Sequence, residues 1–387
     1  MVSYKAECFL VLLLLINFLK FKMFSFFKIT CKELLVLACL ASLKMIAQPS
    51  ELINPNPDFK NLPLINKIYT ADPSAHLFEG RVYIYASHDI ETGSVEDDTG
   101  NHFNMKDYHV ISMNKDGSDL TIHPVGLSVE DVKWAKSRFW APDAAYKNGT
   151  YYLYFPAKDK DEIFRIGVAT SKNPAGPFKA RPKPMKGSYS IDPTTFIDDD
   201  GSAYMYFGGI WGGQLQQWES GEFDPNGSLT DLGIANNPAI MPRMAKLKNN
   251  MLEFDEDVKE IQILNKSGDP ILTKELEIRF FEAPWIHKIK DVYYLSYSTG
   301  DTHNLAYATG DNPYGPFTYQ GILSEPVQGW TNHHSTIKIG EQWYLFYHDT
   351  EISGKTHLRN VKFTRFDHNP DGSISPIKTY FGSDWKF

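Results

Sequence analysis

Five stretches of the chain repeat one pattern of polar and hydrophobic positions. Each starts with a short polar motif, passes through an apolar stretch and a turn, and ends in a run of alternating aromatic residues. The five stretches span residues 71–85, 140–155, 191–207, 281–297 and 332–347. An alternation of period two is typical of β-strands, and its recurrence indicates a repeated structural unit.

The segments between the alternating runs fit tight turns and further strands. Phe78-Glu79-Gly80, Lys147-Asn148-Gly149 and Asp199-Asp200-Gly201 each offer a residue suited to a positive φ angle, as β-hairpins require. A third strand is expected over 165–170 and again over 305–309, and each is followed by an Asn-Pro-x-Gly-Pro-Phe segment. A meander of about four strands in five copies predicts an all-β fold, a five-bladed β-propeller.

We expect residues 48–387 to form this propeller as a single domain. The repeats are unevenly spaced, and the additional residues are expected in surface loops at 91–105 and 238–274, the second with a small ribbon of its own.

Five polar positions are expected to converge on the central channel, because the first strand of each blade lines it. They are Asp72, Asp143, Asp192, Glu282 and His334. Four acids and an imidazole in one pocket are costly for stability, because like charges repel when they lose water. Such a cluster suits acid–base cleavage of a glycosidic bond or metal binding by oxygen ligands. The alternative is that these residues only cap the strand starts.

The N-terminal residues 1–47 are expected to be a targeting segment rather than part of the fold. Two apolar runs, 9–19 and 34–43, are each shorter than the roughly 20 residues that span a bilayer. Lys28 and Lys32 precede the second run, which predicts a signal peptide with translation from Met23 and cleavage after Ala47. Lipoprotein processing at Cys39 and an uncleaved signal anchor stay open as alternatives.

Composition narrows the class of protein. Hydrophobic residues make up 42% of the chain and charged residues 22%, which excludes a disordered or fibrous protein. The net charge is −8 and no basic block is present, so a nucleic-acid partner is not expected. The three cysteines, Cys8, Cys31 and Cys39, fall within the leader, so the rest of the chain has neither disulfides nor thiolate chemistry. Its stability therefore depends on a large core.

Four motifs carry a resemblance to a known family. They are Ala71-Asp72-Pro73-Ser74, Ile191-Asp192-Pro193-Thr194, Phe281-Glu282-Ala283-Pro284-Trp285 and Asn332-His333-His334-Ser335. In this order they resemble glycoside hydrolase family 43, from about residue 63 to the C-terminus. Within that family the chain is most similar to the bacterial β-xylosidase/α-L-arabinofuranosidase group, through segments 85–89, 102–110, 163–168, 208–216 and 298–303.

The resemblance implies a five-bladed propeller and an inverting mechanism. By match, Asp72 is the general base that deprotonates water, and Glu282 is the general acid. Asp192 then positions Glu282 and keeps its pKa raised. Inversion predicts that the carboxyl groups of Asp72 and Glu282 lie roughly 6.5–9.5 Å apart, whereas retention predicts about 5 Å.

Five further residues are expected to bind substrate: Trp140, Asp143, Trp211, His334 and Arg359. By resemblance, Arg359 matches an arginine that contacts the substrate near the base; the alternative is an exposed, ion-paired arginine. Trp211 is expected to stack on a sugar ring, with a buried structural tryptophan as its alternative. Asp143 suits either a substrate hydroxyl or a structural hydrogen bond.

No cofactor is required by the implied reaction, but the resemblance implies a structural calcium ion in the central channel. His334 would lie beside this ion, which would be held mainly through water molecules. A histidine that joins the water network without a metal stays open as the alternative, because calcium prefers oxygen ligands.

These expectations define the predicted function. The chain is expected to be a secreted or periplasmic exo-acting glycosidase that releases terminal xylose or L-arabinofuranose from plant-derived glycans, with no membrane span after cleavage. An endo-acting arabinanase and a sugar-binding propeller without catalysis are the alternatives. The exact sugar, its anomer and the oligomeric state stay open.

Overall fold

The structure is a computed structural model that describes residues 62–230, 236–300 and 302–379. Backbone contacts divide the chain into two compact units, residues 1–48 and 49–387, and every described residue belongs to the second. The expected targeting segment, with Met23, Cys39 and Ala47, lies outside the described residues. Within the described part of the chain, no helix is long and apolar enough to cross a membrane.

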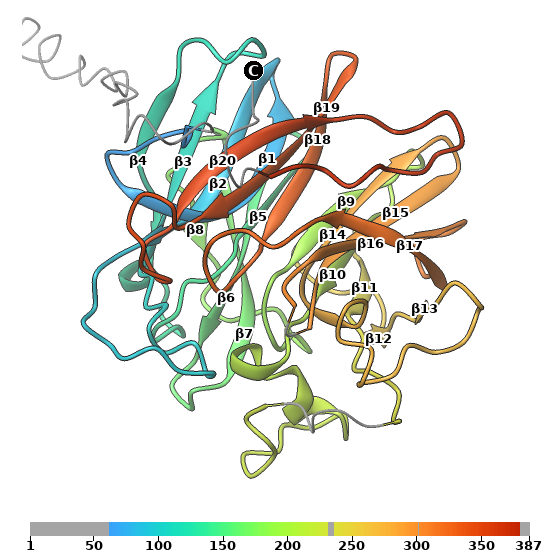
Figure 1. Ribbon diagram of the computed structural model, residues 1–387. Coiled ribbons are helices and arrows are strands. Elements are labelled where there is room, and N and C mark those ends of the chain that lie inside the picture. The colour runs from blue at the N-terminus through green and yellow to red at the C-terminus, as the bar shows by residue number, and fades with distance from the viewer. Residues whose placement is uncertain (1–61, 231–235, 301, 380–387) are drawn as a thin grey trace, which may run out of the picture. The chain divides into compact units, whose positions relative to one another are not determined.

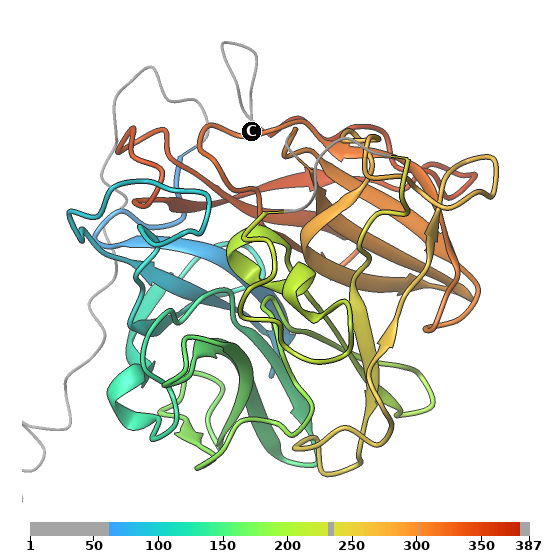
Figure 2. The same cartoon turned by 90° about the horizontal axis from the view of Figure 1, so that it is seen from below.

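The described residues form five sheets, antiparallel except for one short added strand, which are the five blades of a β-propeller (Figures 1 and 2). Blade 1 contains β1 (Tyr69–Phe78), β2 (Arg81–Asp89), β3 (Asp107–Met113) and β4 (Thr121–Ser128). Blade 2 contains β5 (Asp143–Lys147), β6 (Thr150–Lys158), β7 (Phe164–Ser171) and β8 (Lys179–Ala180).

The other three blades follow in chain order. Blade 3 contains β9 (Thr194–Ile197), β10 (Ala203–Phe207), β11 (Arg243–Leu247) and β12 (Lys259–Glu260). Blade 4 contains β14 (Phe280–Ile289), β15 (Val292–Thr299), β16 (Leu305–Gly310) and β17 (Phe317–Ser324), with β13 (Ile263–Leu264) added parallel to β17. Blade 5 contains β18 (His334–Ile339), β19 (Gln342–Asp349) and β20 (Asn360–Phe366). Three short 3₁₀ helices lie outside the sheets: η1 (Val129–Asp131), η2 (Trp211–Gly213) and η3 (Leu215–Trp218).

Alternation along the strands builds a hydrophobic core between each pair of neighbouring blades. On β2, Val82, Ile84 and Ala86 pack toward blade 5, whereas Tyr83 and Tyr85 pack toward blade 2. Comparable clusters join blades 2 and 3, blades 3 and 4, and blades 4 and 5. The prediction of a five-bladed propeller is therefore confirmed.

One expectation about the loops is wrong. Residues 91–105 form a loop as expected, but the segment 238–274 contains β11, the third strand of blade 3, and β12, its outer strand. Only five residues long, β11 carries Arg243 and Lys246 and no aromatic residue, so it lacks the alternation that marks the other strands. The additional residues of blade 3 therefore precede β11 as well as follow it.

The segment before β1 and the start of β1 close the ring against blade 5. The backbone N–H of Leu64 donates to the carbonyl oxygen of Val361 at 2.7 Å, and that of Thr70 donates to Arg359 at 2.9 Å. In Figure 1 the blue β1 accordingly lies beside the red β20. The first and last described blades are thus joined directly, and Arg359 is placed beside β1.

Candidate active site

Asp72 projects from an irregularity in β1. The pairing of β1 with β2 shifts register between Ala71 and Ser74, and Asp72 has a φ of 53°. A non-glycine residue in the left-handed region costs energy and marks positions where function requires an unusual direction. The backbone N–H of Asp72 leaves the ladder and donates to Nδ1 of His348 at 3.0 Å, which fixes this conformation.

Asp192 and Glu282 are joined by a second irregularity, in β14. Register shifts lie on both sides of Glu282, and the next residue, Ala283, has a φ of 58°. In this conformation the backbone N–H of Ala283 donates to Oδ2 of Asp192 at 3.0 Å. Asp192, with a φ of 57°, lies just before β9. Strain in two blades therefore brings the two acidic side chains together.

All three predicted catalytic carboxylates line one pocket, which has an empty volume of about 530 Å³ including its open mouth. Polar residues on its wall are Asp72, Asp98, Asp192, Glu282, His303, Thr331, His333 and Arg359. Aromatic residues on its wall are Phe103, Trp140, Trp211, Phe281 and Trp330. Apolar walls with a few convergent polar groups are typical of a small-molecule site.

Arg359 is buried beside the proposed base and is held by two carboxylates. Its Nη1 donates to Oδ1 of Asp72 at 2.8 Å, and its Nη2 and Nε donate to the two oxygens of Asp89, each at 2.8 Å. The backbone N–H of Arg359 also donates to Asp89. The alternative of an exposed ion pair is excluded, because the side chain is only 3% exposed.

The surroundings of Asp72 favour its ionised form. Burial alone raises the pKa of Asp72, but Arg359 above all, with His348, His333 and the Ser87 hydroxyl, outweighs burial and lowers that pKa below its ordinary value. Burial lowers the pKa of His348 to about 3 and that of His333 to about 4. Both imidazoles are therefore neutral at neutral pH, and Arg359 supplies the lasting positive charge.

Asp192 and Glu282 have the opposite environment. Burial, followed by the charge of Asp72, raises the pKa of Glu282. Burial, followed by the charges of Glu282 and Asp72, raises the pKa of Asp192. Two buried carboxyl groups this close cannot both ionise easily, so the pair retains a proton. The N–H of Ala283 favours the carboxylate form of Asp192, but burial and the neighbouring carboxylates outweigh this contact, so the pKa of Asp192 stays raised.

The structure corrects the register of the second blade. Trp140 lines the pocket, whereas Asp143 lies three residues farther along and does not. Both oxygens of Asp143 have protein partners: Ser74 and His76 contact Oδ1 at 2.6 and 2.8 Å, and the N–H of Thr195 donates to Oδ2. Asp143 therefore ties blades 1, 2 and 3 together below the pocket, and its expected contact with substrate is not supported.

A similar shift of one residue applies to the fifth blade. His333 lines the pocket, with Nδ1 3.7 Å from Oδ2 of Asp192, whereas His334 does not line it. His334 is fully buried, with Nε2 2.6 Å from the hydroxyl of Ser296. The pocket ring is therefore Asp72, Trp140, Asp192, Glu282 and His333.

The surroundings of His334 match calcium only in part. Its Nδ1 is buried and has no hydrogen-bond partner among the described side chains and backbone groups. Calcium takes six to eight oxygen ligands, and both carboxylate oxygens of Asp143, the acid predicted for the second blade, already have protein partners. The residues fit an ion held largely by water, with one imidazole nitrogen, and do not form a calcium cage of protein oxygens.

Loops from different blades close the pocket. The yellow-green segment with η2 and η3 lies near the centre of Figure 2, and a Cβ added at Gly212 would lie 2.6 Å from the carbonyl oxygen of Thr99. Trp211 packs edge to face on Phe281 and lies 6.3 Å from Trp330, between ring centroids. Trp330 in turn stacks on Phe103. Trp211 thus forms an aromatic wall with Trp330 and Phe103, to which the sequence analysis gave no role.

The sequence analysis did not identify several residues of the site. Asp89 and Ser87 lie in the segment 85–89, which carried part of the resemblance without an assigned role, and alternation along β2 brings both to the side of Asp72. His348 offered no signal, because it directly follows an ordinary aromatic strand run. Trp330 lies in a loop outside every repeat unit.

Comparisons with known proteins agree with this geometry. The sequence profile described as Glycosyl hydrolases family 43 matches residues 63–374. The chain is 54% identical to the xylosidase/arabinosidase 43A of Humicola insolens over 81% of this chain and 98% of that protein. It is 50% identical to a xylosidase/arabinosidase of Bacteroides ovatus, over 80% and 95% of the two chains.

A solved structure extends the comparison to three dimensions. CoXyl43 is a GH43 β-xylosidase/α-arabinofuranosidase from a compost microbial metagenome, solved with xylotriose in a calcium-free form. It is 59% identical to the chain, with a TM-score of 0.81 that covers 83% of this chain and 98% of that one.

Proposed function

The chain belongs to the glycosyl hydrolases family 43 and is a glycosidase, and on that premise we propose that it is an inverting, exo-acting enzyme that releases terminal xylose and L-arabinofuranose. The substrates are plant-derived oligosaccharides or polysaccharide side chains. The names of its relatives, which pair xylosidase with arabinosidase, support a dual specificity for pentoses.

One observation carries the proposed mechanism: the same pocket holds one carboxyl group of lowered pKa, Asp72, and two of raised pKa, Asp192 and Glu282. The charge of Arg359 keeps Asp72 ionised, and burial keeps Glu282 protonated. Paired groups whose pKa values are pushed apart divide acid and base roles between them. Asp72 is accordingly the base, and of the two groups with a raised pKa the match to the family motif assigns the acid role to Glu282.

The proposed reaction is a single displacement. Asp72 removes a proton from a water molecule whose oxygen attacks the anomeric carbon from the face opposite the leaving group. Glu282 donates its proton to the glycosidic oxygen as the bond to the anomeric carbon breaks. Asp72 ends protonated and Glu282 ionised, and exchange with solvent restores both. Asp192 positions Glu282 through the β14 irregularity.

The remaining wall residues bind the sugar. Trp140 and Trp211 offer aromatic faces to the sugar ring, and Arg359 lies where it can contact the substrate close to Asp72. The loops that carry Trp211 and Trp330 close the pocket around one end of a chain, which favours exo action over an open cleft.

A substrate screen with product analysis tests this proposal. We expect hydrolysis of both aryl β-xyloside and aryl α-L-arabinofuranoside, and NMR should show the inverted anomer of the sugar as the first product. Retention of configuration would exclude the base role of Asp72. Release of internal fragments from linear arabinan would select an endo-arabinanase, and no hydrolysis of any pentoside would select a sugar-binding propeller.

We also propose that the enzyme is exported, since the leader fits a signal peptide cleaved after Ala47. Mass analysis of the mature protein from a secreting host should give Gln48 as the first residue. Lipid modification at Cys39, or retention of the whole leader in the membrane, would contradict this processing.

The proposed reaction uses side chains and one water molecule and needs no cofactor. We therefore assign calcium a role in the stability of the fold and not in catalysis. We propose that an ion in the channel is held by His334 Nδ1 and by water molecules. Calcium added after EDTA dialysis should then raise the thermal midpoint, and His334→Ala should abolish the increase. An increase that persists in His334→Ala would place the ion elsewhere.

A further inference from the structure

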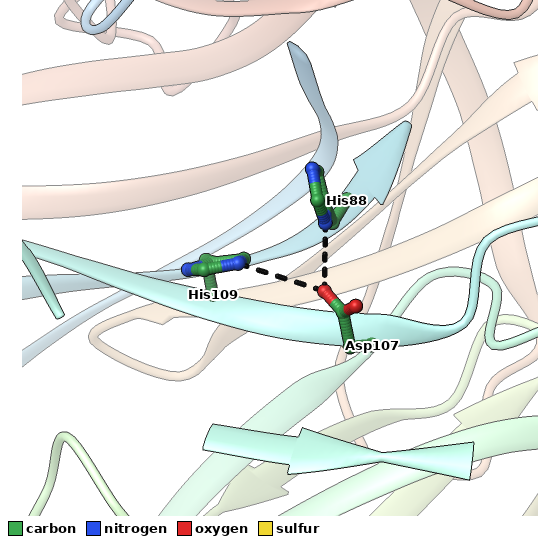
Figure 3. Close-up of side chains that lie close together, drawn as sticks. All are labelled: His88, Asp107 and His109. Atoms are coloured by element: carbon green, nitrogen blue, oxygen red, sulfur yellow. Dashed lines mark hydrogen bonds and ion pairs between the residues drawn. The ribbon is translucent and has the colours of Figure 1, made fainter. Parts of the chain in front are cut away.

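Three side chains with metal-binding atoms gather at one end of blade 1, away from the pocket wall (Figure 3). Asp107 and His109 are two residues apart on β3, so they share one face of the sheet. His88 follows the Ser87–Tyr108 pair on β2 and therefore lies opposite Asp107. One ligand atom from each of the three residues lies within 4.8 Å of the other two.

The cluster is separate from the active site because strands alternate. Ser87 and Asp89, on either side of His88, turn toward Asp72 and Arg359. His88 turns to the other face of β2, which carries Ala86 and Ile84. The side chains of His88, Asp107 and His109 are 21%, 22% and 14% exposed, so an ion can reach them from solvent.

Hydrogen bonding fixes one imidazole in the form that a metal requires. Nδ1 of His109 lies 3.1 Å from the carbonyl oxygen of His123, so it must carry the proton in order to donate. Nε2 of His109 therefore presents a lone pair, and it points at Oδ1 of Asp107, 3.6 Å away. Two acceptor atoms that face each other are satisfied by a cation between them.

His88 and Asp107 complete the ligand set with His109. Nδ1 of His88 lies 2.8 Å from the same Oδ1 of Asp107, and the two imidazole rings meet nearly perpendicular at 4.9 Å between centroids. Zinc–nitrogen and zinc–oxygen bonds of about 2.0–2.2 Å in a tetrahedron place ligand atoms roughly 3.3–3.6 Å apart. Nε2 of His109 already lies 3.6 Å from Oδ1 of Asp107, and Nδ1 of His88, at 2.8 Å, needs to move outward by less than about 1 Å to reach this spacing.

We propose that His88, Asp107 and His109 bind one divalent transition-metal ion, with zinc as the best fit and water as the fourth ligand. Two imidazoles and one carboxylate match zinc rather than calcium or magnesium, which take mainly oxygen ligands. The bond from His109 to the carbonyl of His123 is the outer hydrogen bond that commonly orients a metal-bound histidine. The site does not depend on the proposed reaction.

Isothermal titration of the EDTA-treated full chain with zinc chloride tests this proposal. We expect one zinc site that His88→Ala and His109→Ala each weaken about tenfold or more, and calcium should not compete for it. Asp107→Asn keeps the size of the side chain and should weaken the site as well, so that loss of binding is not loss of folding. Affinity that is unchanged in all three variants would overturn the proposal.

His123→Ala is the matched control. It removes a histidine from the neighbouring strand β4 but keeps the backbone carbonyl that His109 uses, so zinc affinity should stay the same. A loss equal to that of His109→Ala would show a general effect on blade 1 and contradict the assignment. The titration also distinguishes zinc bound by the leader cysteines from zinc at this site, because binding by the cysteines would persist in every histidine variant.

Copper provides a spectroscopic test of the ligands. In the electron paramagnetic resonance spectrum of the copper(II)-loaded protein, we expect hyperfine coupling to two nitrogen nuclei. His88→Ala and His109→Ala should each leave coupling to one nitrogen. Spectra that are identical in the parent and both variants would place copper at another site and refute the proposed ligand set.

Discussion

At the scale of single residues, the proposed chemistry depends on two carboxyl groups that keep opposite protonation states. Asp72 owes its lowered pKa to Arg359, because burial alone would raise it. Arg359 also lowers the pKa of Glu282, but burial and the charge of Asp72 outweigh it, so that pKa stays raised. We therefore expect kcat/KM to depend on pH as a bell, rising as Asp72 ionises and falling as Glu282 loses its proton.

Arg359→Gln should shift the acidic side of this bell to higher pH. Loss of the adjacent positive charge raises the pKa of Asp72, so a higher pH is needed to ionise the base. The pH profile of kcat/KM measures the shift. Arg165→Gln removes an arginine that pairs with Asp159 outside the pocket, and its profile should match the parent. An unshifted acidic side in Arg359→Gln would contradict the role of this charge.

Glu282→Ala should lose activity in proportion to the difficulty of the leaving group. General acid catalysis contributes about 10²–10⁴-fold, and it matters most when the departing oxygen is strongly basic. We expect a loss of this size on xylo-oligosaccharides and a much smaller loss on an activated aryl xyloside. Glu260→Gln, a half-exposed partner of Arg243, is the control. Equal losses on both substrates would rule Glu282 out as the acid.

At the scale of elements, periodicity predicted the blades, because aromatic alternation and hairpin turns are local properties of the chain. The register of the first strands could not be predicted in the same way. Trp140-Ala141-Pro142 and Glu282-Ala283-Pro284 share an Ala-Pro step that aligns Trp140 with Glu282, yet the acidic character of Asp143 suggested the other alignment. His333 and His334 are adjacent histidines, and only the irregular strand starts decide which one faces the pocket.

Local sequence patterns also could not predict the register shifts in β1 and β14. Ala283 adopts a positive φ although alanine gains nothing from it locally, because the resulting N–H direction serves Asp192 in another blade. Asp89 could be recognised only once β20 lay beside β1 and β2, since its partner Arg359 is 270 residues away. Contacts of this range follow from closure of the ring and not from any sequence period.

Asp143→Ala and Trp140→Ala should separate stability from binding. Asp143 accepts hydrogen bonds from blades 1 and 3, and its loss leaves the buried N–H of Thr195 without a partner, at a cost of about 2–4 kcal/mol in the free energy of unfolding. Trp140→Ala should instead raise KM, because the ring lines the pocket. Urea unfolding and Michaelis kinetics on both variants measure the two effects. A KM raised by Asp143→Ala at unchanged stability would restore its role in substrate binding.

At the scale of the whole molecule, the ring is held closed between blade 5 and blade 1, where no loop connects neighbouring strands. Leu64 contributes to this junction through its backbone bond to Val361 and through a side chain that is 5% exposed in the core shared by the two blades. The same junction places Arg359 beside Asp72, so its integrity concerns the site as well as the fold.

Leu64→Ala should therefore lower the free energy of unfolding far more than truncation of an exposed leucine of blade 1. A buried leucine truncated to alanine costs about 2–5 kcal/mol, from lost burial and the cavity that stays behind. Leu77, at the end of β1 and 38% exposed, is the matched control, and Leu77→Ala should change the free energy of unfolding little. Urea titration followed by tryptophan fluorescence compares the two. If both variants unfold at the same urea concentration, the segment before β1 is not what closes the propeller, and the contacts of β1 with β18 and β19 must hold blade 5 in place instead.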